Sequence, residues 1–428
     1  MPPSSLLRKQ RVTSGKFAEP SVKLSSRGVL RLHGRHPWVY RSDILAPKDV
    51  GKDARKSAAS NELNEVPPGA VVRVLDERGK FLGTALYSSS SQIAIRMISH
   101  GSVPDLPALV AERIRAAVAY RKENGLISNT DAYRVVFSEA DFLPGLIIDR
   151  YNDVLSLQIL TQAMDGAPAR KAILQTLREE LQPAGIVERV ESRIRELEQL
   201  PPLESRLLWG EKSSTEVGMN GVRFYYDRLE GQKTGAFLDQ RENYAAAAQY
   251  AHGEALDAFC YQGGFALHLA LSSAGKCSSV TGVDSSRPAL EMAEKNALLN
   301  GRELEWIEAN AFDLLREYSA ANRRYDTIVL DPPAFAKTKR DLDKALGGYK
   351  ELNLRAMKML RPGGTLVTCS CSFHVSPADF LKVVADAAQD AHKSLRIIEH
   401  RGASKDHPIL LNVPETSYLQ CLILSVSN

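Results

Sequence analysis

The sequence predicts an α/β fold, with a doubly wound domain in its C-terminal half, preceded by a small β-barrel module and an α+β segment. From about Glu254 onward, apolar β-rich runs alternate with stretches of helical periodicity, and such repeated units form parallel sheets with helices on both faces. Residues 21–102 instead carry short runs of alternating polarity separated by turns, which is typical of small barrels. A length of 428 residues suits two or three domains.

Shifts in periodicity divide the chain into four parts. We expect a disordered tail at 1–20, the barrel module at 21–102, a central α+β domain at 103–220 and the doubly wound domain at 221–428. Residues 46–67 are polar and aperiodic, which indicates a loop insertion within the barrel module. The barrel strands are expected within 22–34, 36–44, 70–88 and 91–99.

Individual elements can be predicted in the two later parts. Apolar spacing predicts central helices over Leu106–Glu123 and near Pro168–Leu181, with paired strands between them that turn at Leu143–Gly145 and Asn152–Asp153. Strands near 185–190 and 222–226 follow. In the last part, strands are expected at 255–260, 278–284, 304–309, 325–331 and 364–371, and helices at 266–274, 286–301, 311–323 and 348–364.

Composition narrows the class of protein. The apolar share of 44% and charged share of 25% are ordinary for a globular protein, and no run of about 18 apolar residues suggests a membrane span. The N-terminus lacks the apolar segment of a secretory signal, and the five cysteines include no Cys-x-x-Cys pair. We therefore expect a cytoplasmic protein without disulfides, a metal site or a membrane partner.

Positive charge is concentrated at the N-terminus. Residues 1–45 hold nine Lys or Arg and two acids, a net +7, whereas the remaining chain is near neutral at −3. A basic segment on a near-neutral body suggests contact with a polyanion such as nucleic acid. A merely solvated basic tail is the alternative, above all for residues 1–20.

Two motifs predict a nucleoside-binding edge. In Ala255–Ala270 an apolar strand runs into a Gly263-Gly264 pair and then a helix, a turn that lets a ligand approach a helix N-terminus. Asp284 ends the next strand, 20 residues after Gly264, where an acid can accept hydrogen bonds from ribose hydroxyls. The spacing is not Gly-x-Gly-x-x-Gly, so an NAD-binding fingerprint is absent. A plain turn and a helix cap are the alternatives for these residues.

Two further segments follow later strands. Asn310 ends the third strand and could contact an adenine edge beside Ala311, or cap the next helix. Asp331 opens Asp-Pro-Pro-Ala-Phe directly after an apolar strand, and the two prolines stiffen that loop and remove two donors. We expect Asp331 to be held rigidly at the sheet's carboxyl edge.

A strand ending in Thr-Cys-Ser-Cys-Ser brings a thiol to the same edge. Cys369 and Cys371 share a face because successive strand residues alternate, and Cys371 lies nearer the strand end. We interpret Cys371 as functional and Cys369 as a small buried apolar residue. Before the first strand–helix unit, a Lys-Thr-Gly turn leads to Asp239, Gln240 and Arg241 at an expected helix start, which could close a cofactor cleft or be a capped surface helix.

Read together, these motifs resemble the bacterial family that methylates carbon 5 of a cytosine in 23S ribosomal RNA. The resemblance runs from about Lys23 to the C-terminus and rests on HPWVYRSDI, EADFLPGLIIDRY, KTGAFLDQRE, FCYQGGFA, DPPAF, SCS and DHP. It implies a PUA-like RNA-binding barrel, a central α+β domain and a Rossmann-like class I methyltransferase domain that binds S-adenosylmethionine. RNA is then the expected partner, and a homodimer is one option for the assembly.

Carried over by motif, the resemblance implies roles for single residues. Cys371 would be the nucleophile and Asp331 would face the target base, near the cofactor. The other cofactor-binding residues would be Asp239, Gln240, Arg241, Asp257, Phe259, Tyr261, Gly263, Gly264, Asp284, Ser285, Asn310 and Ala311. Family members often have an acid at the position of Asn310, which leaves the adenine contact open. The candidate RNA contacts are Lys23, Arg35, His36, Arg41 and His407, with Trp38 equally suited to the barrel core and His407 to a structural role.

The implied chemistry needs a thiol because cytosine C5 is a weak nucleophile. A thiolate adding at C6 makes C5 enamine-like and divides one difficult step into easier ones. A protonated Asp331 could stabilise the adduct through the ring N3 or amino group. Three alternatives remain open: an RNA methyltransferase acting on exocyclic amines, a uracil target, and a non-catalytic RNA-binding assembly factor.

Overall fold

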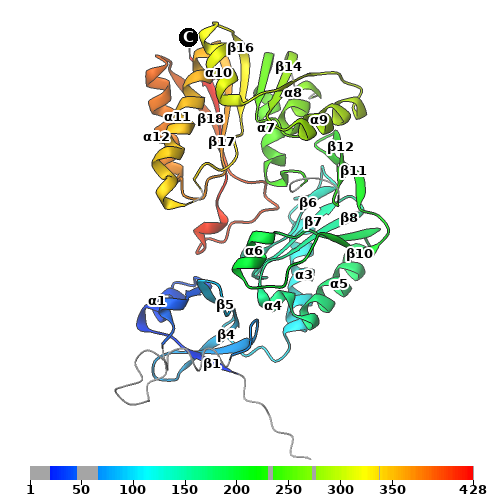
Figure 1. Cartoon of the computed structure of the whole chain (residues 1–428), viewed down its shortest axis with the longest axis vertical. Helices are drawn as coiled ribbons and strands as arrows, with labels where there is room; N and C mark the ends of the chain where they lie inside the picture. Colours follow the sequence, from blue (N-terminus) through cyan, green and yellow to red (C-terminus); the bar gives the residue numbers. More distant parts are fainter. Residues whose placement is uncertain (1–19, 46–65, 230–234, 272–275, 337, 428) are drawn as a thin grey trace, which may run out of the picture. The chain divides into compact units, whose positions relative to one another are not determined.

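The computed structural model describes residues 20–45, 66–229, 235–271, 276–336 and 338–427 (Figure 1). These residues belong to two compact units, Met1–Pro104 and Asp105–Asn428. The expected tail at 1–20 and loop insertion at 46–67 fall almost entirely outside the described ranges. No helix within those ranges is long and apolar enough to cross a bilayer.

The N-terminal unit is built on a five-stranded sheet in the order β1-β3-β4-β5-β2. Its core consists of buried aliphatic side chains, among them Leu24, Val39, Val72 and Ile95. The elements are β1 (Ser21–Lys23), α1 (Ser26–His33), β2 (Trp38–Tyr40), η1 (Arg41–Asp43), β3 (Val71–Leu75), β4 (Phe81–Tyr87) and β5 (Ile93–Ser99).

One prediction for this unit is wrong, because residues 22–34 do not form a long strand. The strand ends at Lys23 and helix α1 begins at Ser26, where the Ser25 hydroxyl accepts a hydrogen bond from the Gly28 N–H at 3.4 Å. Gly28 and Leu32, four residues apart, face the core, which is helical spacing. A sequence this short, with mixed apolar and basic residues, fits the two-residue period of a strand as well as the 3.6-residue period of a helix.

The second unit begins with the predicted α+β arrangement. Helices α3 (Leu106–Glu123) and α5 (Ala167–Leu181) lie close to their predicted bounds and pack together. They accompany a sheet in the order β10-β9-β8-β7-β6, whose strands are β6 (Ala132–Phe137), β7 (Leu146–Tyr151), β8 (Val154–Ile159), β9 (Gly185–Glu188) and β10 (Arg206–Gly210). The short helices α4 (Gln162–Asp165) and α6 (Ser192–Leu197) and strand β10 were not predicted.

A hairpin connects this sheet to the next. Strands β11 (Ser214–Met219) and β12 (Val222–Asp227) pair antiparallel around Asn220-Gly221. Both turn residues have positive φ, 53° and 84°, as a two-residue hairpin turn requires. The buried hairpin face packs on residues of helices α8 (Gly264–Leu271) and α9 (Arg287–Leu299). The hairpin thus belongs to the same compact unit as both sheets, and a division of that unit at residue 220 stays a prediction.

A seven-stranded sheet in the order β15-β14-β13-β16-β17-β19-β18 forms the last part. Its first five strands pair parallel, as predicted, whereas β19 pairs antiparallel with both neighbours. The chain returns from β18 through a loop without a crossover helix, so an antiparallel pairing results. The bounds are β13 (His252–Ala258), β14 (Lys276–Asp284), β15 (Glu305–Glu308), β16 (Tyr325–Leu330), β17 (Leu360–Ser370), β18 (Leu395–Arg401) and β19 (Gln420–Val426).

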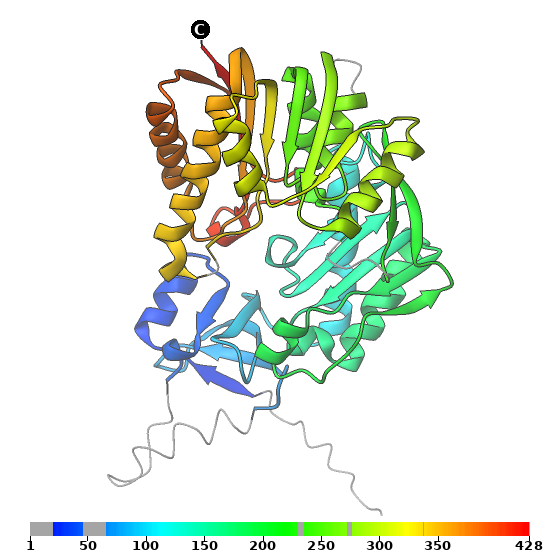
Figure 2. The ribbon, with the colours of Figure 1, turned by 45° about the horizontal axis from the view of Figure 1, so that its top comes forward.

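Helices cover both faces of this sheet, which is the predicted doubly wound arrangement. Successive strand residues face opposite sides: Leu256, Ile328 and Leu366 pack with one set of helices, and Ala255 and Val329 with the other. The first set comprises α10 (Ala311–Ala320), α11 (Leu342–Met359) and α12 (Pro377–Asp390), and the second includes α7 (Arg241–Tyr250) and α8. Figures 1 and 2 show the orange and green helices on opposite sides of the sheet. The parallel strands therefore bring their carboxyl ends to one edge.

Candidate active site

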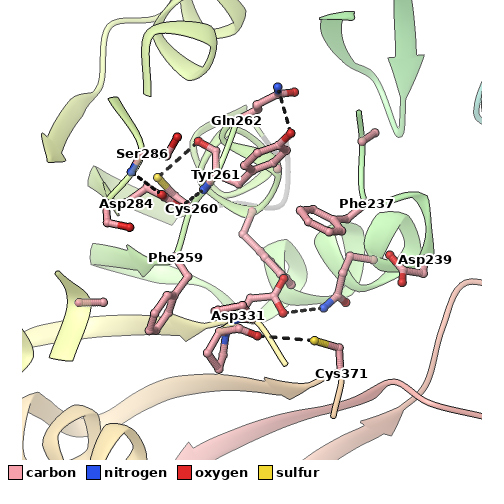
Figure 3. Close-up of a pocket in the computed structure, with 18 of the residues that line it drawn as sticks. Phe237, Asp239, Phe259, Cys260, Tyr261, Gln262, Asp284, Ser286, Asp331 and Cys371 are labelled. Atoms are coloured by element: carbon pink, nitrogen blue, oxygen red, sulfur yellow. Dashed lines mark hydrogen bonds between the residues drawn. The ribbon is translucent and has the colours of Figure 1, made fainter. Parts of the chain in front are cut away.

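A cavity of about 550 Å³ opens at the carboxyl edge of the seven-stranded sheet. Figure 3 shows Asp284 on one side of it, and Asp331 and Cys371 on another. Its walls come from the loops after the parallel strands, from the segment before α7 and from the loop before β19. Among the predicted site residues, Asp239, Gln240, Phe259, Tyr261, Gly264, Asp284, Ser285, Asn310, Ala311, Asp331 and Cys371 line it.

The loop after β13 holds Asp284 at the cavity. Phe259 and Tyr261 both have positive φ, 69° and 51°, which side chains rarely adopt and which tightens this turn. The Tyr261 N–H donates to one Asp284 oxygen at 3.0 Å, and the Ser286 N–H donates to the other at 2.9 Å. The carboxylate is thus fixed by two backbone donors, and each oxygen keeps a lone pair for a ligand hydroxyl.

Asp257 and Gly263 support this loop from behind and do not line the cavity. Asp257 is fully buried and accepts a hydrogen bond from the Ala266 N–H at 2.8 Å, and burial raises its pKa well above its usual range. Gly263 has φ 84°, a conformation that favours glycine. Their part is to shape the strand–helix turn beneath the cavity.

Asn310 caps helix α10. Its side-chain oxygen accepts hydrogen bonds from the Phe312 N–H at 2.9 Å and the Asp313 N–H at 3.4 Å. The oxygen that could have met an adenine amino group is therefore already engaged. Asn310 lines the cavity together with Ala311 and Phe312, which supply an apolar wall.

The Asp331 loop and the Cys371 segment are bound to each other. The Cys371 thiol donates a hydrogen bond to the Pro332 carbonyl oxygen at 3.7 Å. The Ser372 hydroxyl accepts from the Phe335 N–H at 2.9 Å and the Ala336 N–H at 3.3 Å. The Tyr349 hydroxyl shares a further hydrogen bond of 2.9 Å with Ser372. Loop and thiol are thereby held as one rigid group.

Burial shifts both ionisable groups of this pair. The pKa of Asp331 is raised to about 7 by burial and then by Asp239, although hydrogen bonds from Gln240 and Cys369 oppose the shift. The pKa of Cys371 is raised to about 12 by burial, then by the negative charges of Asp331 and Asp239. At neutral pH the carboxyl is about half protonated and the thiol is protonated.

The segment before α7 splits into residues with different surroundings. The Gln240 amide donates to an Asp331 oxygen at 2.9 Å, and Asp239 accepts from the Tyr418 hydroxyl at 2.6 Å. Arg241 is buried, does not line the cavity and forms a salt bridge with Asp406 at 3.2 Å. The preceding turn residues 232–234 lie outside the described ranges.

Several supporting residues were missed by the sequence reasoning. Cys369, expected to be an inert buried residue, is buried and lowers the pKa of Asp331. Tyr418 and Phe237 line the cavity from distant points of the chain, and Ser372 and Asn243 hold the groups that do. The Ser-Cys-Ser repeat was the available signal for Ser372, whereas no spacing pattern marks Tyr418 or Asn243.

The predicted RNA contacts lie in varied surroundings. Lys23 and Arg35 are exposed, the latter at φ 60°, and His36 packs edge-on against Trp38. Arg41 donates to the carbonyl oxygens of Ser88 and Ser91 at 2.8 and 2.9 Å, which anchors a neighbouring loop. His407 is buried against Asp406 and does not line the cavity. Across the described ranges, no cluster of three His, Cys, Asp or Glu side chains could hold a metal ion.

The cavity has the chemistry that S-adenosylmethionine requires. Asp284 offers acceptors for ribose hydroxyls, and Phe259, Ala311 and Phe312 offer an apolar wall for a flat base. Asp239 and Gln240 add polar groups for the amino-acid end. The residues present therefore fit this cofactor.

Comparison with known proteins agrees with this geometry. A family model described as S-adenosylmethionine-dependent methyltransferase matches residues 166–423, and a PUA-like domain model matches residues 22–100. The protein from Shewanella amazonensis named ribosomal RNA large subunit methyltransferase I is 38% identical over 95% of this chain and 99% of its own length. A protein of the same name from Tolumonas auensis is also 38% identical, over 91% of this chain and 95% of its own.

Solved structures support the fold. A candidate SAM-dependent methyltransferase from Streptococcus mutans matches with a TM-score of 0.76 at 18% identity, over 95% of this chain and all of that one. SMU.776, a candidate methyltransferase complexed with SAH, matches with a TM-score of 0.77 over the same shares, also at 18% identity. The chain therefore belongs to the S-adenosylmethionine-dependent methyltransferases with an N-terminal PUA-like domain, in the family whose curated members are named ribosomal RNA large subunit methyltransferase I.

Proposed function

We propose that this enzyme methylates carbon 5 of a cytosine in large-subunit ribosomal RNA through a covalent bond to Cys371. The single observation that carries the proposal is that a cavity suited to the cofactor contains a thiol, Cys371, beside a carboxyl group, Asp331. Methylation of an exocyclic amine would need the carboxyl group but no thiol. The names of the relatives support the choice of RNA, and a ribosomal substrate would place the enzyme in the cytoplasm.

Cys371 acts as the nucleophile in this proposal. Because the thiol is protonated in the free protein, a base first takes its proton. The thiolate then bonds to C6 of the cytosine, which moves electron density to C5 and N3 and makes C5 nucleophilic. Bound S-adenosylmethionine supplies the methyl group as an activated electrophile. Once C5 carries the methyl group it loses its proton to a base, and the bond between Cys371 and C6 breaks, which restores the aromatic ring and the thiolate.

Asp331 would stabilise the adduct. Its pKa of about 7 keeps a large neutral fraction at physiological pH, so it can donate a hydrogen bond to the ring N3 as negative charge develops there. Asp239, Gln240, Phe259, Tyr261, Asp284, Asn310 and Ala311 would surround the cofactor. Asp257, Gly263 and Arg241 would act on it indirectly, through the turns that they support.

The target base must leave any stacked helix to reach a cavity at a sheet edge. The PUA-like domain, with Lys23 and Arg35 exposed, would bind the surrounding RNA. Arg41 and His407 would act on RNA through the loops that they hold.

Mass spectrometry of nucleosides from ribosomal RNA tests the proposal directly. RNA incubated with the protein and cofactor should gain 5-methylcytidine, and the Cys371→Ser variant should produce none while binding cofactor with unchanged affinity. Cys277→Ser is the matched control, because Cys277 is a half-buried thiol on β14 that does not line the cavity. A methylated guanine or adenine product, or full turnover by Cys371→Ser, would contradict the proposal.

A further inference from the structure

A chain of hydrogen bonds leads from the edge strand β18 to Asp331. The Arg401 Nε–H donates to the Asn243 side-chain oxygen at 2.8 Å. The Asn243 amide N–H donates to the Gln240 side-chain oxygen at 2.7 Å, and the Gln240 amide N–H donates to Asp331 at 2.9 Å. Asn243 and Gln240 are buried, with 1% and 3% of their surface exposed, so water does not compete for these bonds.

At the contact between Arg401 and Asn243, only one hydrogen-bond direction is possible. A guanidinium can only donate, so the Asn243 atom facing Arg401 must be its oxygen. A backbone carbonyl can only accept, so the Asn243 atom that lies 3.0 Å from the Gly402 carbonyl must be its nitrogen. The Asn243 amide is therefore fixed by two partners that cannot exchange roles.

The orientation of the Asn243 amide determines the orientation of the Gln240 amide beside Asp331. Because Asn243 presents an N–H, Gln240 must present its oxygen outward and its own N–H to Asp331. Because Gln240 donates, a proton on Asp331 finds no acceptor in that amide, and since Asp331 lines the cavity the geometry directs the proton there.

We infer that the Arg401–Asn243–Gln240 chain sets the hydrogen-bond direction of Asp331 and thereby selects cytosine over uracil. The inference rests on the proposed function. Neutral cytosine has an acceptor at N3, which matches a carboxyl proton directed into the cavity. Uracil carries a hydrogen at N3 and would face that proton with a second donor. Asn243 is a positioning residue in this arrangement, since it acts only through Gln240.

Asn243→Asp reverses the chain with almost no change in shape. A carboxylate at 243 accepts from Arg401 and from Gln240, although its second oxygen then faces the Gly402 carbonyl without a hydrogen bond. The Gln240 amide therefore turns and presents its oxygen to Asp331. The Asp331 proton is then donated backward, and its cavity oxygen becomes an acceptor. We expect turnover of cytosine RNA to fall about 10- to 100-fold, with KM for RNA changed by no more than roughly twofold. The cytosine-to-uracil rate ratio should also fall about tenfold or more.

A second readout needs neither cofactor nor RNA. Carbon-13 NMR titration of aspartate carboxyls, with the Asp331 signal assigned by its loss in Asp331→Asn, should show a higher Asp331 pKa in Asn243→Asp than in wild type. Asn300→Asp is the matched control, because Asn300 donates to the Arg223 and Asn296 carbonyls at the far end of α9. It should leave the Asp331 titration and turnover unchanged.

The possible results distinguish failure of this inference from failure of the proposed function. If Asn243→Asp does not fold, Arg401→Gln removes the guanidinium and should lower turnover in the same direction. This inference is overturned if the wild-type protein produces 5-methylcytidine but the folded variant shows the wild-type rate ratio and the wild-type Asp331 titration. The proposed function would then still stand. Failure of the wild-type protein to produce 5-methylcytidine overturns the proposed function itself.

Discussion

The Cys371 thiol lies against the loop that carries Asp331, donating its hydrogen bond to the Pro332 carbonyl oxygen at 3.7 Å. The proposed nucleophile and the proposed acid are therefore parts of one rigid assembly. The thiol is protonated and hydrogen-bonded in the free protein, so the proposed reaction requires this contact to break. The reactivity of the Cys371 thiol in the absence of substrate therefore reports on its protonation and on its hydrogen bond to Pro332.

Alkylation of Cys371 should be slow at neutral pH. Its pKa of about 12 means that the thiolate fraction, and with it the rate, rises about tenfold per pH unit through the alkaline range. Asp331→Asn removes a neighbouring negative charge and should speed alkylation at a given pH, whereas Asp284→Asn should not. Peptide mass spectrometry after timed iodoacetamide treatment measures this. A rate at neutral pH equal to that of an exposed cysteine would contradict it.

The pH dependence of kcat/KM should have two regimes. Below about pH 7 the Asp331 carboxyl stays neutral, and the rate rises about tenfold per unit as thiolate forms. Between the pKa values of about 7 and about 12, loss of the neutral carboxyl offsets the gain of thiolate, so the profile flattens. Asp331→Asn keeps a donor that cannot ionise, so its profile should continue to rise above pH 7. An identical break near pH 7 in that variant would exclude Asp331 as its cause.

Gly264→Ala should weaken cofactor binding. A Cβ at 264 would lie 2.5 Å from the Tyr244 ring, a rigid side chain at the cavity wall, so the ring or the helix start must move. Gly347→Ala in helix α11 is the control, because its Cβ meets nothing within 4 Å. Calorimetric titration with S-adenosylhomocysteine should show at least about tenfold weaker binding for Gly264→Ala alone. Equal affinities in the two variants would show that this wall does not contact the cofactor.

Asp406 joins parts of the second unit and should be important for its stability. It is fully buried, forms a salt bridge with Arg241 at 3.2 Å and accepts from the Arg134 N–H at 2.8 Å, and its own carbonyl accepts from Arg121. Asp406→Ala removes the carboxylate that pairs with the buried Arg241 and the acceptor of the Arg134 N–H, and should lower the free energy of unfolding by about 3–5 kcal/mol. Glu291→Ala, in the exposed pair with Arg287, should change it by less than about 1 kcal/mol. Chemical denaturation measures both.

The same site gives a pH prediction with a definite sign. Burial opposes ionisation of Asp406, but His407, Arg241 and the Arg134 N–H outweigh it and hold its pKa well below its usual range. Because this pKa is lower in the folded than in the unfolded state, the Asp406 carboxylate stabilises the fold at pH values above its unfolded-state pKa near 3.8. That stabilisation is lost as the pH falls toward the folded-state pKa. The stability difference between wild type and Asp406→Ala should therefore narrow in acid. A difference that stays constant down to about pH 2 would contradict this assignment.

The fold could be predicted where periodicity is strong. Asp284 and Asp331 come directly after apolar strands, and parallel strands bring such residues to one edge, so their meeting follows from sequence order alone. Helix α1 was missed because a short stretch of mixed letters fits two periods. The antiparallel strand β19 was missed because its direction depends on the path of the preceding loop. That path cannot be predicted from the residue types.

Supporting contacts were harder to predict. Arg241 was expected near the cofactor because the family resemblance implies that role for Asp239–Arg241. A helical turn points neighbouring residues in different directions, and Arg241 contacts Asp406 instead. Tyr418 lies 179 residues from Asp239, whose carboxylate it contacts, so no local pattern could pair them. The contacts of single residues such as these depend on tertiary packing.

Covalent trapping on a fluorinated substrate shows whether Cys371 bonds to the target cytosine. RNA containing 5-fluorocytosine cannot complete the reaction, because fluorine does not leave C5 as a cation and the bond at C6 then persists. With cofactor present, wild-type protein should form a denaturation-resistant complex whose only cross-linked peptide contains Cys371, and Cys371→Ala should form none. Efficient methylation of cytosine without such a complex, or a cross-link to another residue, would contradict the account.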